Sequence, residues 1–241
     1  MEPSISSNAG PTAPVSISRT SKLQSFAQPG GVSLFAYVQA MRSILVQSKA
    51  ERIAVLGSAG GTLGTMMARS GARPVLVDIN PDAFALARKY FWLDPSIDCV
   101  VADARRFLSD GTELFDAIVL DAFGSDDMPP HLATVGFFSL ARKRLLPQGL
   151  LVVNVPTDRR HRARLASLSA AIAASGFPVT VFDDPRETCR NSLVVGGYLP
   201  DIELLIGDEP AETRRELTSL RQQRTDVRST AVARAQALRR R

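Results

Sequence analysis

A chain of 241 residues with 45% hydrophobic and 22% charged residues can bury a full core and has the composition of a globular protein, which excludes a mainly disordered or fibrous chain. No apolar run approaches the roughly 18–20 residues of a membrane-spanning helix. The net charge of +5 is concentrated in residues 211–241, whose nine Arg and three acidic residues sum to +6 and leave −1 for the rest of the chain.

The cysteines and histidines give little indication of a metal or redox site. Cys99 and Cys189 are too few and too far apart for a disulfide framework or a metal site. The N-terminus lacks the basic and then apolar layout of a signal peptide. His131 and His161 lie in polar surroundings and are expected at the surface. We therefore expect a cytoplasmic protein with reduced thiols, no metal and no membrane span.

Three segments differ in composition. Residues 1–31 are rich in Ser, Pro, Ala and Gly and show no strand pattern, so they are predicted to be disordered. Residues 32–200 are predicted to form one α/β domain. Residues 201–241 form an Arg-rich extension, in which the part from Ala211 onward is either a loosely attached helix or disordered. We interpret it as a solvated tail, with contact to nucleic acid or an anionic surface as the alternative.

Strand-like and helix-like segments alternate through residues 32–200. Apolar residues at helical spacing predict a helix over 33–47. Strands are predicted at 52–56, 74–78, 98–101, 115–120, 150–155, 178–182 and 192–198, and intervening helices at 65–70, 80–91, 104–108, 131–145 and 159–175. This order predicts a doubly wound, mostly parallel, seven-stranded Rossmann-like sheet with helices on both faces. The last two strands are predicted to form an antiparallel pair.

A glycine-rich turn joins the first two predicted strands. It contains four glycines, Gly57, Gly60, Gly61 and Gly64. Glycine lets the backbone turn sharply and approach a ligand, and the N-terminus of the next helix attracts negative groups. Asp78 ends the second strand, a position that suits ribose hydroxyls. A strict G-x-G-x-x-G cannot be placed over 57–64, which disfavours NAD, but the unit is typical of nucleoside binding.

Two further aspartates follow predicted strands of the same sheet. Because ligands of open parallel sheets bind at the carboxyl ends of the strands, Asp78, Asp103 and Asp121 should gather at one edge. Asp103 and the backbone of Ala104 are placed for an adenine edge. Asp121 then faces whatever reacts with the nucleoside.

Simpler interpretations stand beside these. The glycines could merely shape a tight turn, and Asp78 or Asp103 could cap a helix. Asp121 ends a buried apolar strand, so it needs a partner or a ligand. Asp183 and Asp184 follow a predicted edge strand and are interpreted as a turn.

Two motifs carry a resemblance to a known family. They are Val-Ala-Asp-Ala-Arg-Arg-Phe-Leu over 101–108 and Phe-Asp-Ala-Ile-Val-Leu-Asp-Ala-Phe-Gly-Ser-Asp-Asp-Met-Pro-Pro over 115–130. In these motifs the chain resembles the spermidine synthase (polyamine aminopropyltransferase) family, over roughly 34–198. The resemblance implies the class I S-adenosylmethionine-dependent methyltransferase fold. It also implies decarboxylated or ordinary S-adenosylmethionine as co-substrate, no metal, and a polyamine or other amine acceptor.

The resemblance also implies roles for individual residues. Asp78 would hold the ribose and Asp103-Ala104 would meet the adenine. Asp121 would bind the amine and accept its proton, a role that makes chemical sense because a protonated amine has no lone pair for attack. Asp126 would be a second substrate-binding carboxylate.

The chain departs from the family pattern in three places. Gly60 replaces an acidic residue that recognises the amine of decarboxylated S-adenosylmethionine. Gly124 stands where the family has its second loop carboxylate, with Asp126 two residues further on. Residues 1–31 show no pattern for the small N-terminal β-domain. The leading hypothesis is aminopropyl transfer. A methyltransferase and a non-catalytic nucleoside- or polyamine-binding relative are the alternatives, and a homodimer is left open.

Overall fold

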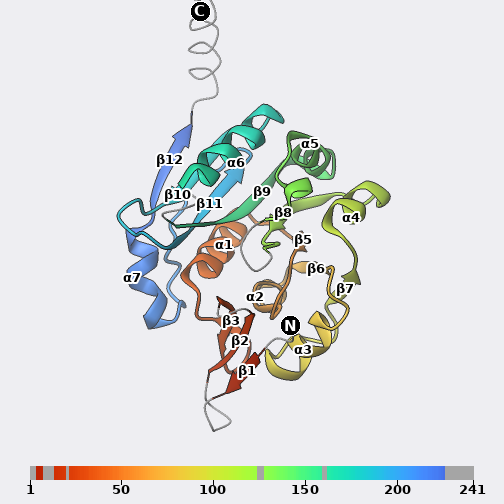
Figure 1. Cartoon of the computed structure of the whole chain (residues 1–241), viewed down its shortest axis with the longest axis vertical. Coiled ribbons are helices and arrows are strands. Elements are labelled where there is room, and N and C mark those ends of the chain that lie inside the picture. Colours follow the sequence, from red (N-terminus) through yellow and green to blue (C-terminus); the bar gives the residue numbers. More distant parts are fainter. Residues whose placement is uncertain (1–3, 8–13, 20–21, 124–127, 159–161, 226–241) are drawn as a thin grey trace, which may run out of the picture.

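The computed structural model describes residues 4–7, 14–19, 22–123, 128–158 and 162–225. Within these residues the chain forms an eight-stranded sheet with helices on both faces and a separate four-stranded sheet near the N-terminus (Figure 1). The predicted doubly wound α/β fold is confirmed.

The large sheet has the strand order β12-β10-β11-β9-β8-β5-β6-β7. Its strands are β5 (Arg52–Leu56), β6 (Arg73–Asp78), β7 (Asp98–Val101), β8 (Phe115–Leu120), β9 (Leu145–Thr157), β10 (Val179–Asp183), β11 (Arg190–Gly196) and β12 (Arg221–Thr225). Strands β5 to β9 pair in parallel, whereas β10, β11 and β12 join through antiparallel pairs. The predicted count of seven strands is one short, because β12 was not foreseen.

Helices cover the two faces of this sheet. One face carries α1 (Ala36–Gln47), α2 (Thr62–Arg69), α3 (Ala83–Tyr90) and α7 (Ala211–Ser219), and the other carries α4 (Ala104–Asp110), α5 (Val135–Lys143) and α6 (Arg162–Ala174). A short 3-10 turn, Pro130–Leu132, precedes α5. In the described part of the chain, no helix combines the length and hydropathy of a membrane span.

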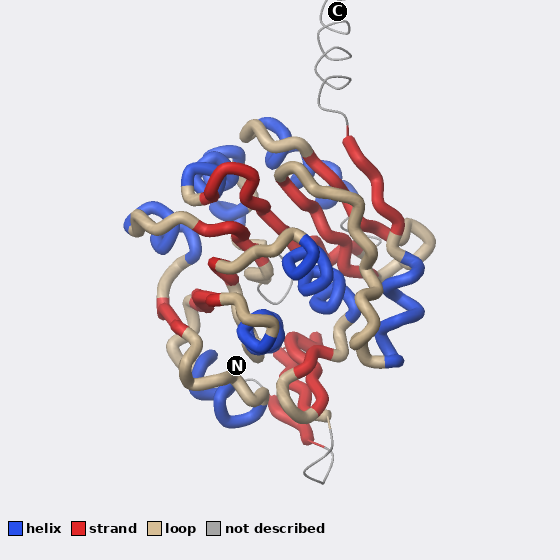
Figure 2. The backbone as a smooth tube through the Cα atoms, turned by 180° about the vertical axis from the view of Figure 1, so that it is seen from behind, coloured by secondary structure: helices blue, strands red, loops and turns tan. Residues whose placement is uncertain are grey.

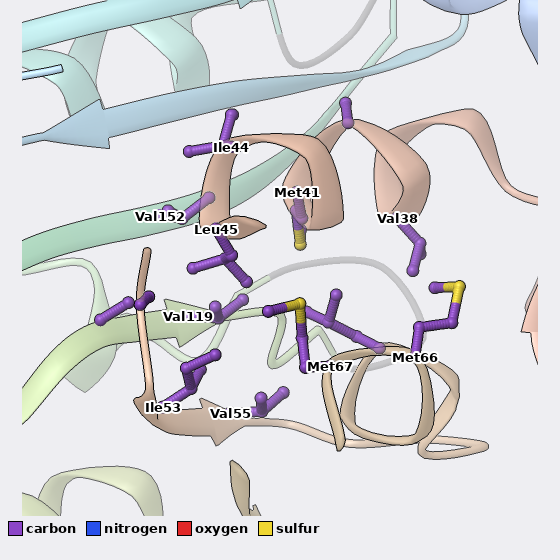
Figure 3. Close-up of a cluster of buried hydrophobic side chains, with 14 of the residues drawn as sticks. Val38, Met41, Ile44, Leu45, Ile53, Val55, Met66, Met67, Val119 and Val152 are labelled. Atoms are coloured by element: carbon purple, nitrogen blue, oxygen red, sulfur yellow. The ribbon is translucent and has the colours of Figure 1, made fainter. Parts of the chain in front are cut away.

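The core beneath α1 fixes this helix against the middle of the sheet (Figure 3). Buried side chains meet there from α1, α2, β5, β8 and β9 and include Val38, Met41, Ile44, Leu45, Ile53, Val55, Met66, Met67, Val119 and Val152. Each large apolar side chain buried in this way contributes roughly 1.5–3 kcal/mol. The packing holds the first turns of α1, including Tyr37, at a set distance from β5 and β8.

The prediction of disorder for residues 1–31 is wrong for most of the described part of this segment. Four antiparallel strands are present, β1 (Ser4–Ser7), β2 (Val15–Arg19), β3 (Lys22–Gln28) and β4 (Val32–Ser33). Figures 1 and 2 show this sheet beside α2 and α3. Backbone pairing and a small cluster of Val15, Ala27 and Phe91 hold it. The alternation of Val15 and Ile17 with serines in β2 is the short strand signal that the prediction overlooked.

The C-terminal segment is also more firmly attached than predicted. On α7, Leu217 is 1% exposed and belongs to the main core. The segment before α7 is anchored on α1, where Arg42 binds Asp208 at 2.6 and 2.7 Å and Ser43 donates to the carbonyl of Leu204. The alternative interpretation of the Arg-rich tail, contact with nucleic acid or an anionic surface, stays a prediction, and residues 226–241, with five of the nine arginines of the tail, lie outside the described residues.

Candidate functional site

The strand order places a crevice between β5 and β8. The chain leaves β5 toward β6 on one side, whereas β8 lies on the other side, and such a switch point is where open α/β sheets bind ligands. The N–H of Asp121 donates to the carbonyl of Leu56, and the N–H of Gly57 donates to that of Val77. The glycine turn and Asp121 therefore lie side by side at the carboxyl edge of the sheet.

The glycine turn needs glycine for steric reasons at its first position. Gly57 has φ +85°, and a Cβ atom there would lie 2.6 Å from the carbonyl oxygen of Asp121. Gly61, also at positive φ, is the N-cap of α2, and Gly61, Thr62 and Leu63 line the cleft. The N-terminus of α2 thus faces the cleft, as the sequence predicts.

Asp78 lies at the end of β6, across from the glycine turn. Its Oδ2 accepts hydrogen bonds from the N–H of Ser58 at 3.0 Å and from the Ser58 hydroxyl, and its Oδ1 accepts one from the N–H of Asn80. The N-cap of α3 is Asp82, so Asp78 does not cap that helix. Each carboxylate oxygen has two lone pairs, which leaves Oδ1 able to accept another donor. Its role on a ribose stays a prediction.

Asp103 does cap a helix, the α4 helix, which was the simpler interpretation. Its Oδ1 accepts from the N–H groups of Arg105 and Arg106, and its Oδ2 lies 2.8 Å from Nε2 of His131. Burial raises the pKa of Asp103, but the hydrogen bonds from His131 and the backbone outweigh it, so the pKa lies below its ordinary value. Contact of Asp103 and Ala104 with an adenine stays a prediction.

Asp121 has two neutral partners from distant parts of the chain. The hydroxyl of Tyr37 on α1 donates to Oδ2 at 3.3 Å, and the amide of Asn154 on β9 donates to Oδ1 at 2.7 Å. Burial raises the pKa of Asp121 to about 7, and the hydrogen bonds from Asn154 and Tyr37 limit that rise. Burial and the neighbouring Asp121 raise the pKa of Tyr37 well above its ordinary value of 10. Tyr37 therefore stays protonated while Asp121 exchanges a proton near neutral pH.

The N-terminal sheet takes part in the cleft. The hydroxyl of Ser25 on β3 accepts the N–H of Gly60 at 2.8 Å, and Gln24 also lines the cleft. A Cβ atom at Gly60 would lie 2.9 Å from both the Phe91 ring and the Ser25 hydroxyl oxygen. The space beside Gly60 is thus filled by Phe91 and Ser25, which leaves no room for a larger side chain at this position.

Exposed apolar side chains accompany the polar groups at this edge. Ile79 follows Asp78 and is 71% exposed, and Val101, in register with Asp78 on β7, is 53% exposed. The enclosed part of the cleft between the glycine turn, Tyr37 and Asp121 has a volume of about 20 Å³, room for about one water. Entry of a larger group there requires lining side chains to move.

Sequence reasoning missed the roles of four residues of this site. Tyr37 was assigned to the apolar face of a helix and Ser25 to a disordered segment. His131 is exposed, as predicted, but its contact with Asp103 was not predicted. Asn154 offered a signal, because it is the one polar residue in the apolar run 150–155. Asp126 and its neighbour Asp127 lie outside the described residues, so the predicted second carboxylate is not placed. Within the described residues, no group of three His, Cys, Asp or Glu side chains is arranged to hold a metal.

The chain has relatives among known proteins in sequence and in fold. No protein-family model matches the chain. It is 31% identical over 128 residues to the polyamine aminopropyltransferase of Vibrio vulnificus (strain CMCP6), which covers 50% of this chain and 43% of that protein. The crystal structure of a probable spermidine synthase from Corynebacterium glutamicum ATCC 13032 superposes with a TM-score of 0.75 and 22% identity, over 95% of this chain and 90% of that chain.

The chain is spermidine-synthase-like. The fold is that of class I S-adenosylmethionine-dependent methyltransferases, since human methyltransferase-like protein 13 in complex with SAH also superposes, with a TM-score of 0.55 and 18% identity over 77% of this chain and 90% of that chain. This spermidine-synthase-like chain spans about half the length of the first curated relatives it matches, 43% and 48%. These matches show the fold and the likeness to spermidine synthases, whereas the activity of this chain is proposed below.

Proposed function

We propose that this spermidine-synthase-like protein transfers an aminopropyl group from decarboxylated S-adenosylmethionine to an amine of a polyamine. The observation that carries the proposal is Asp121, a carboxylate at the switch point whose partners are both neutral and whose pKa is raised to about 7. A group with this pKa accepts a proton efficiently at neutral pH.

The nucleoside would lie across the ends of β5, β6 and β7. A ribose hydroxyl would donate to Oδ1 of Asp78, and the exposed side chain of Ile79 would pack on the adenine. The adenine amino group would donate to Oδ2 of Asp103, either beside His131 or in its place, and the N–H of Ala104 would donate to a ring nitrogen of the adenine. The sulfonium would then point along the glycine turn toward Asp121.

The chemistry follows from this placement. The lone pair of the acceptor amine attacks the methylene carbon beside the sulfonium, the carbon–sulfur bond breaks, and methylthioadenosine leaves with the bonding electrons. Attack turns the acceptor nitrogen into a positively charged secondary ammonium, which has one proton more than the neutral product amine, and the carboxylate of Asp121 takes that proton. A carboxylate also attracts the cationic acceptor and orients its nitrogen for in-line attack.

The filled space at Gly60 changes how the donor would be recognised. The terminal amine of decarboxylated S-adenosylmethionine would meet the hydroxyl of Ser25 in place of the family's carboxylate. The methyltransferase alternative is not favoured by the relatives, all of which carry aminopropyltransferase names. The non-catalytic alternative rested partly on a missing N-terminal β-domain, whereas β3 is present and lines the cleft.

The test is a product assay with wild-type protein. Decarboxylated or ordinary S-adenosylmethionine is incubated with putrescine or spermidine, and products are identified by mass spectrometry. The proposal expects methylthioadenosine and an aminopropylated amine from the decarboxylated donor. A methylated product, or methylthioadenosine binding without turnover of either donor, would overturn it.

A further inference from the structure

We propose that Asn154 is a positioning residue, which fixes the carboxylate of Asp121 with its Oδ2 toward the cleft and favours the charged form of that carboxylate. The inference rests on the proposed proton-accepting role of Asp121 and adds to it a residue on a different strand. It concerns how the base is held, and which of its two oxygens receives the proton.

The two hydrogen bonds of Asp121 are unequal. Asn154 is 2% exposed and donates to Oδ1 at 2.7 Å, whereas Tyr37, which lines the cleft, donates to Oδ2 at 3.3 Å. The parallel pairing of Leu120 with Val153 brings the next residues of the two strands, Asp121 and Asn154, side by side. The shorter bond thus anchors Oδ1 on the buried side and leaves Oδ2 as the oxygen on the side of the cleft.

The apolar surroundings of Asn154 make a buried amide at this position energetically unfavourable. Its neighbours Val153 and Val155 along β9 and Leu193 on β11 are all 0% exposed. The Oδ1 atom of Asn154 is buried without a hydrogen-bond partner, and a buried unpaired carbonyl destabilises the folded state. An aliphatic side chain would suit this position better for packing alone. The amide is therefore explained by the one bond it makes, to Asp121.

An uncharged donor also suits a base that works near neutral pH. Among the described residues, the titratable group that touches Asp121 is the phenol of Tyr37 on α1, and the glycine turn and β9 contribute Gly57 and Asn154, which carry no charge. A Lys or Arg at position 154 would lower the pKa of Asp121 strongly and weaken it as a base. An amide favours the carboxylate to a smaller extent and does not itself titrate.

The experiment measures the titration of Asp121 directly, without substrate. Side-chain carboxyl carbons of aspartate are labelled with ¹³C, and the Asp121 resonance is assigned by its loss in Asp121→Asn. Removal of the amide in Asn154→Leu should raise the pKa of Asp121 by about one unit or more, because a hydrogen bond to a charged group is lost. Asn154→Gln, which retains an amide, should lie closer to wild type. Asn191→Leu is the matched control, since Asn191 pairs with Pro156 on the same strand pair, away from Asp121.

The outcomes separate this inference from the proposed function. If Asn154→Leu binds methylthioadenosine like wild type and titrates Asp121 at an unchanged pKa, Asn154 is not a positioning residue. A raised pKa supports the inference even if wild type transfers no aminopropyl group, in which case the proposed function alone fails. If wild type is active, the acid limb of its kcat profile should move to higher pH in step with the pKa, with little change in KM for the donor. Should Asn154→Leu fail to fold, Asn154→Ser gives the same measurement with less steric change.

Discussion

Two aspartates at the carboxyl edge of the large sheet have opposite surroundings. Asp121 follows β8 and has only neutral donors among its described partners, Tyr37 and Asn154. Asp183 ends β10 and is 6% exposed, and the guanidinium of Arg190 binds it at 2.5 and 3.0 Å. Ser192 donates a further hydrogen bond to it.

These partners give the same residue type two different acidities. At Asp121 burial dominates and raises the pKa to about 7. At Asp183 burial also raises the pKa, but the bonds from Arg190 and Ser192 outweigh it and hold the pKa below its ordinary value. One carboxylate is suited to proton exchange and the other to a permanent ion pair. The partners, and not the position at the end of a strand, decide which chemistry an aspartate can perform.

The largest expected effect separates the two carboxylates by activity. Asp121→Asn keeps the shape of the side chain but loses the base, so aminopropyl transfer should fall by about 10²–10⁴-fold, the usual contribution of a general base. Asp183→Asn should leave kcat of the folded fraction within a few-fold of wild type. The measurement is kcat for both variants at a temperature where both are folded. An active Asp121→Asn enzyme would contradict the catalytic assignment.

The second effect separates them by stability. Asp183→Asn leaves Arg190, whose side chain is only 14% exposed, without this charged partner, so the free energy of unfolding should fall by about 3–5 kcal/mol. Replacing both partners, as in Asp183→Leu with Arg190→Met, should recover much of this loss, because no buried charge remains unpaired. Urea denaturation measures both variants. Equal destabilisation by the single and the double change would show that packing, and not charge, is responsible.

The third effect is the pH dependence of stability. Asp121 has a pKa of about 7 in the folded state and about 3.8 in the unfolded state, so the folded protein keeps this proton up to a higher pH. The free energy of unfolding therefore falls as the pH rises from about 4 to 7. Asp121→Asn removes this pH dependence. The free energy of unfolding of the variant, relative to that of wild type, should therefore be up to about 4 kcal/mol higher at pH 8 than at pH 4. Asp183 has the opposite sign: its contribution is present above its unfolded pKa and is lost as pH falls through its lower folded pKa. Denaturation of wild type and Asp121→Asn across pH 4–8 checks the slope, and parallel curves would contradict it.

Sequence alone predicts the role of Asp121 better than the role of Asp183. Asp121 could be singled out because it ends a buried apolar strand, where a carboxylate needs a partner or a ligand. Its partners could not be found in the same way, since they are 84 and 33 residues away: Tyr37 meets Asp121 only after α1 packs on the sheet, and Asn154 only after β9 pairs with β8. Asp183 was interpreted as part of a turn. The ion pair with Arg190 depends on the hairpin of β10 and β11, and β12 covers the edge that the sequence left open.

The same reasoning explains which parts of the fold were predicted. Strands β5, β7 and β8 agree with their predicted bounds, because each is a short, mostly apolar run in a parallel sheet. The N-terminal sheet was missed because its strands are short and lie in a segment rich in Ser, Pro, Ala and Gly, and because they depend on pairing with one another and on Phe91 of a distant segment. Strand β9 begins earlier than predicted, at Leu145, and runs through Pro147 and Gly149.

The smallest expected effect concerns Asp78, a third carboxylate of this edge, which accepts hydrogen bonds from backbone N–H groups and a serine hydroxyl. If Asp78 holds the ribose, Asp78→Ala should weaken methylthioadenosine binding by roughly 1.5–3 kcal/mol, the range for hydrogen bonds to a charged group. Asp116→Ala is the matched control, because Asp116 also accepts backbone N–H groups, those of Glu51 and Arg52, but at the start of β5, on the opposite edge of the sheet. Isothermal titration calorimetry compares the two variants. Since both lose a carboxylate that binds backbone groups, a loss of affinity confined to Asp78→Ala reports on the ligand, whereas equal losses would mean that Asp78 only supports the glycine turn.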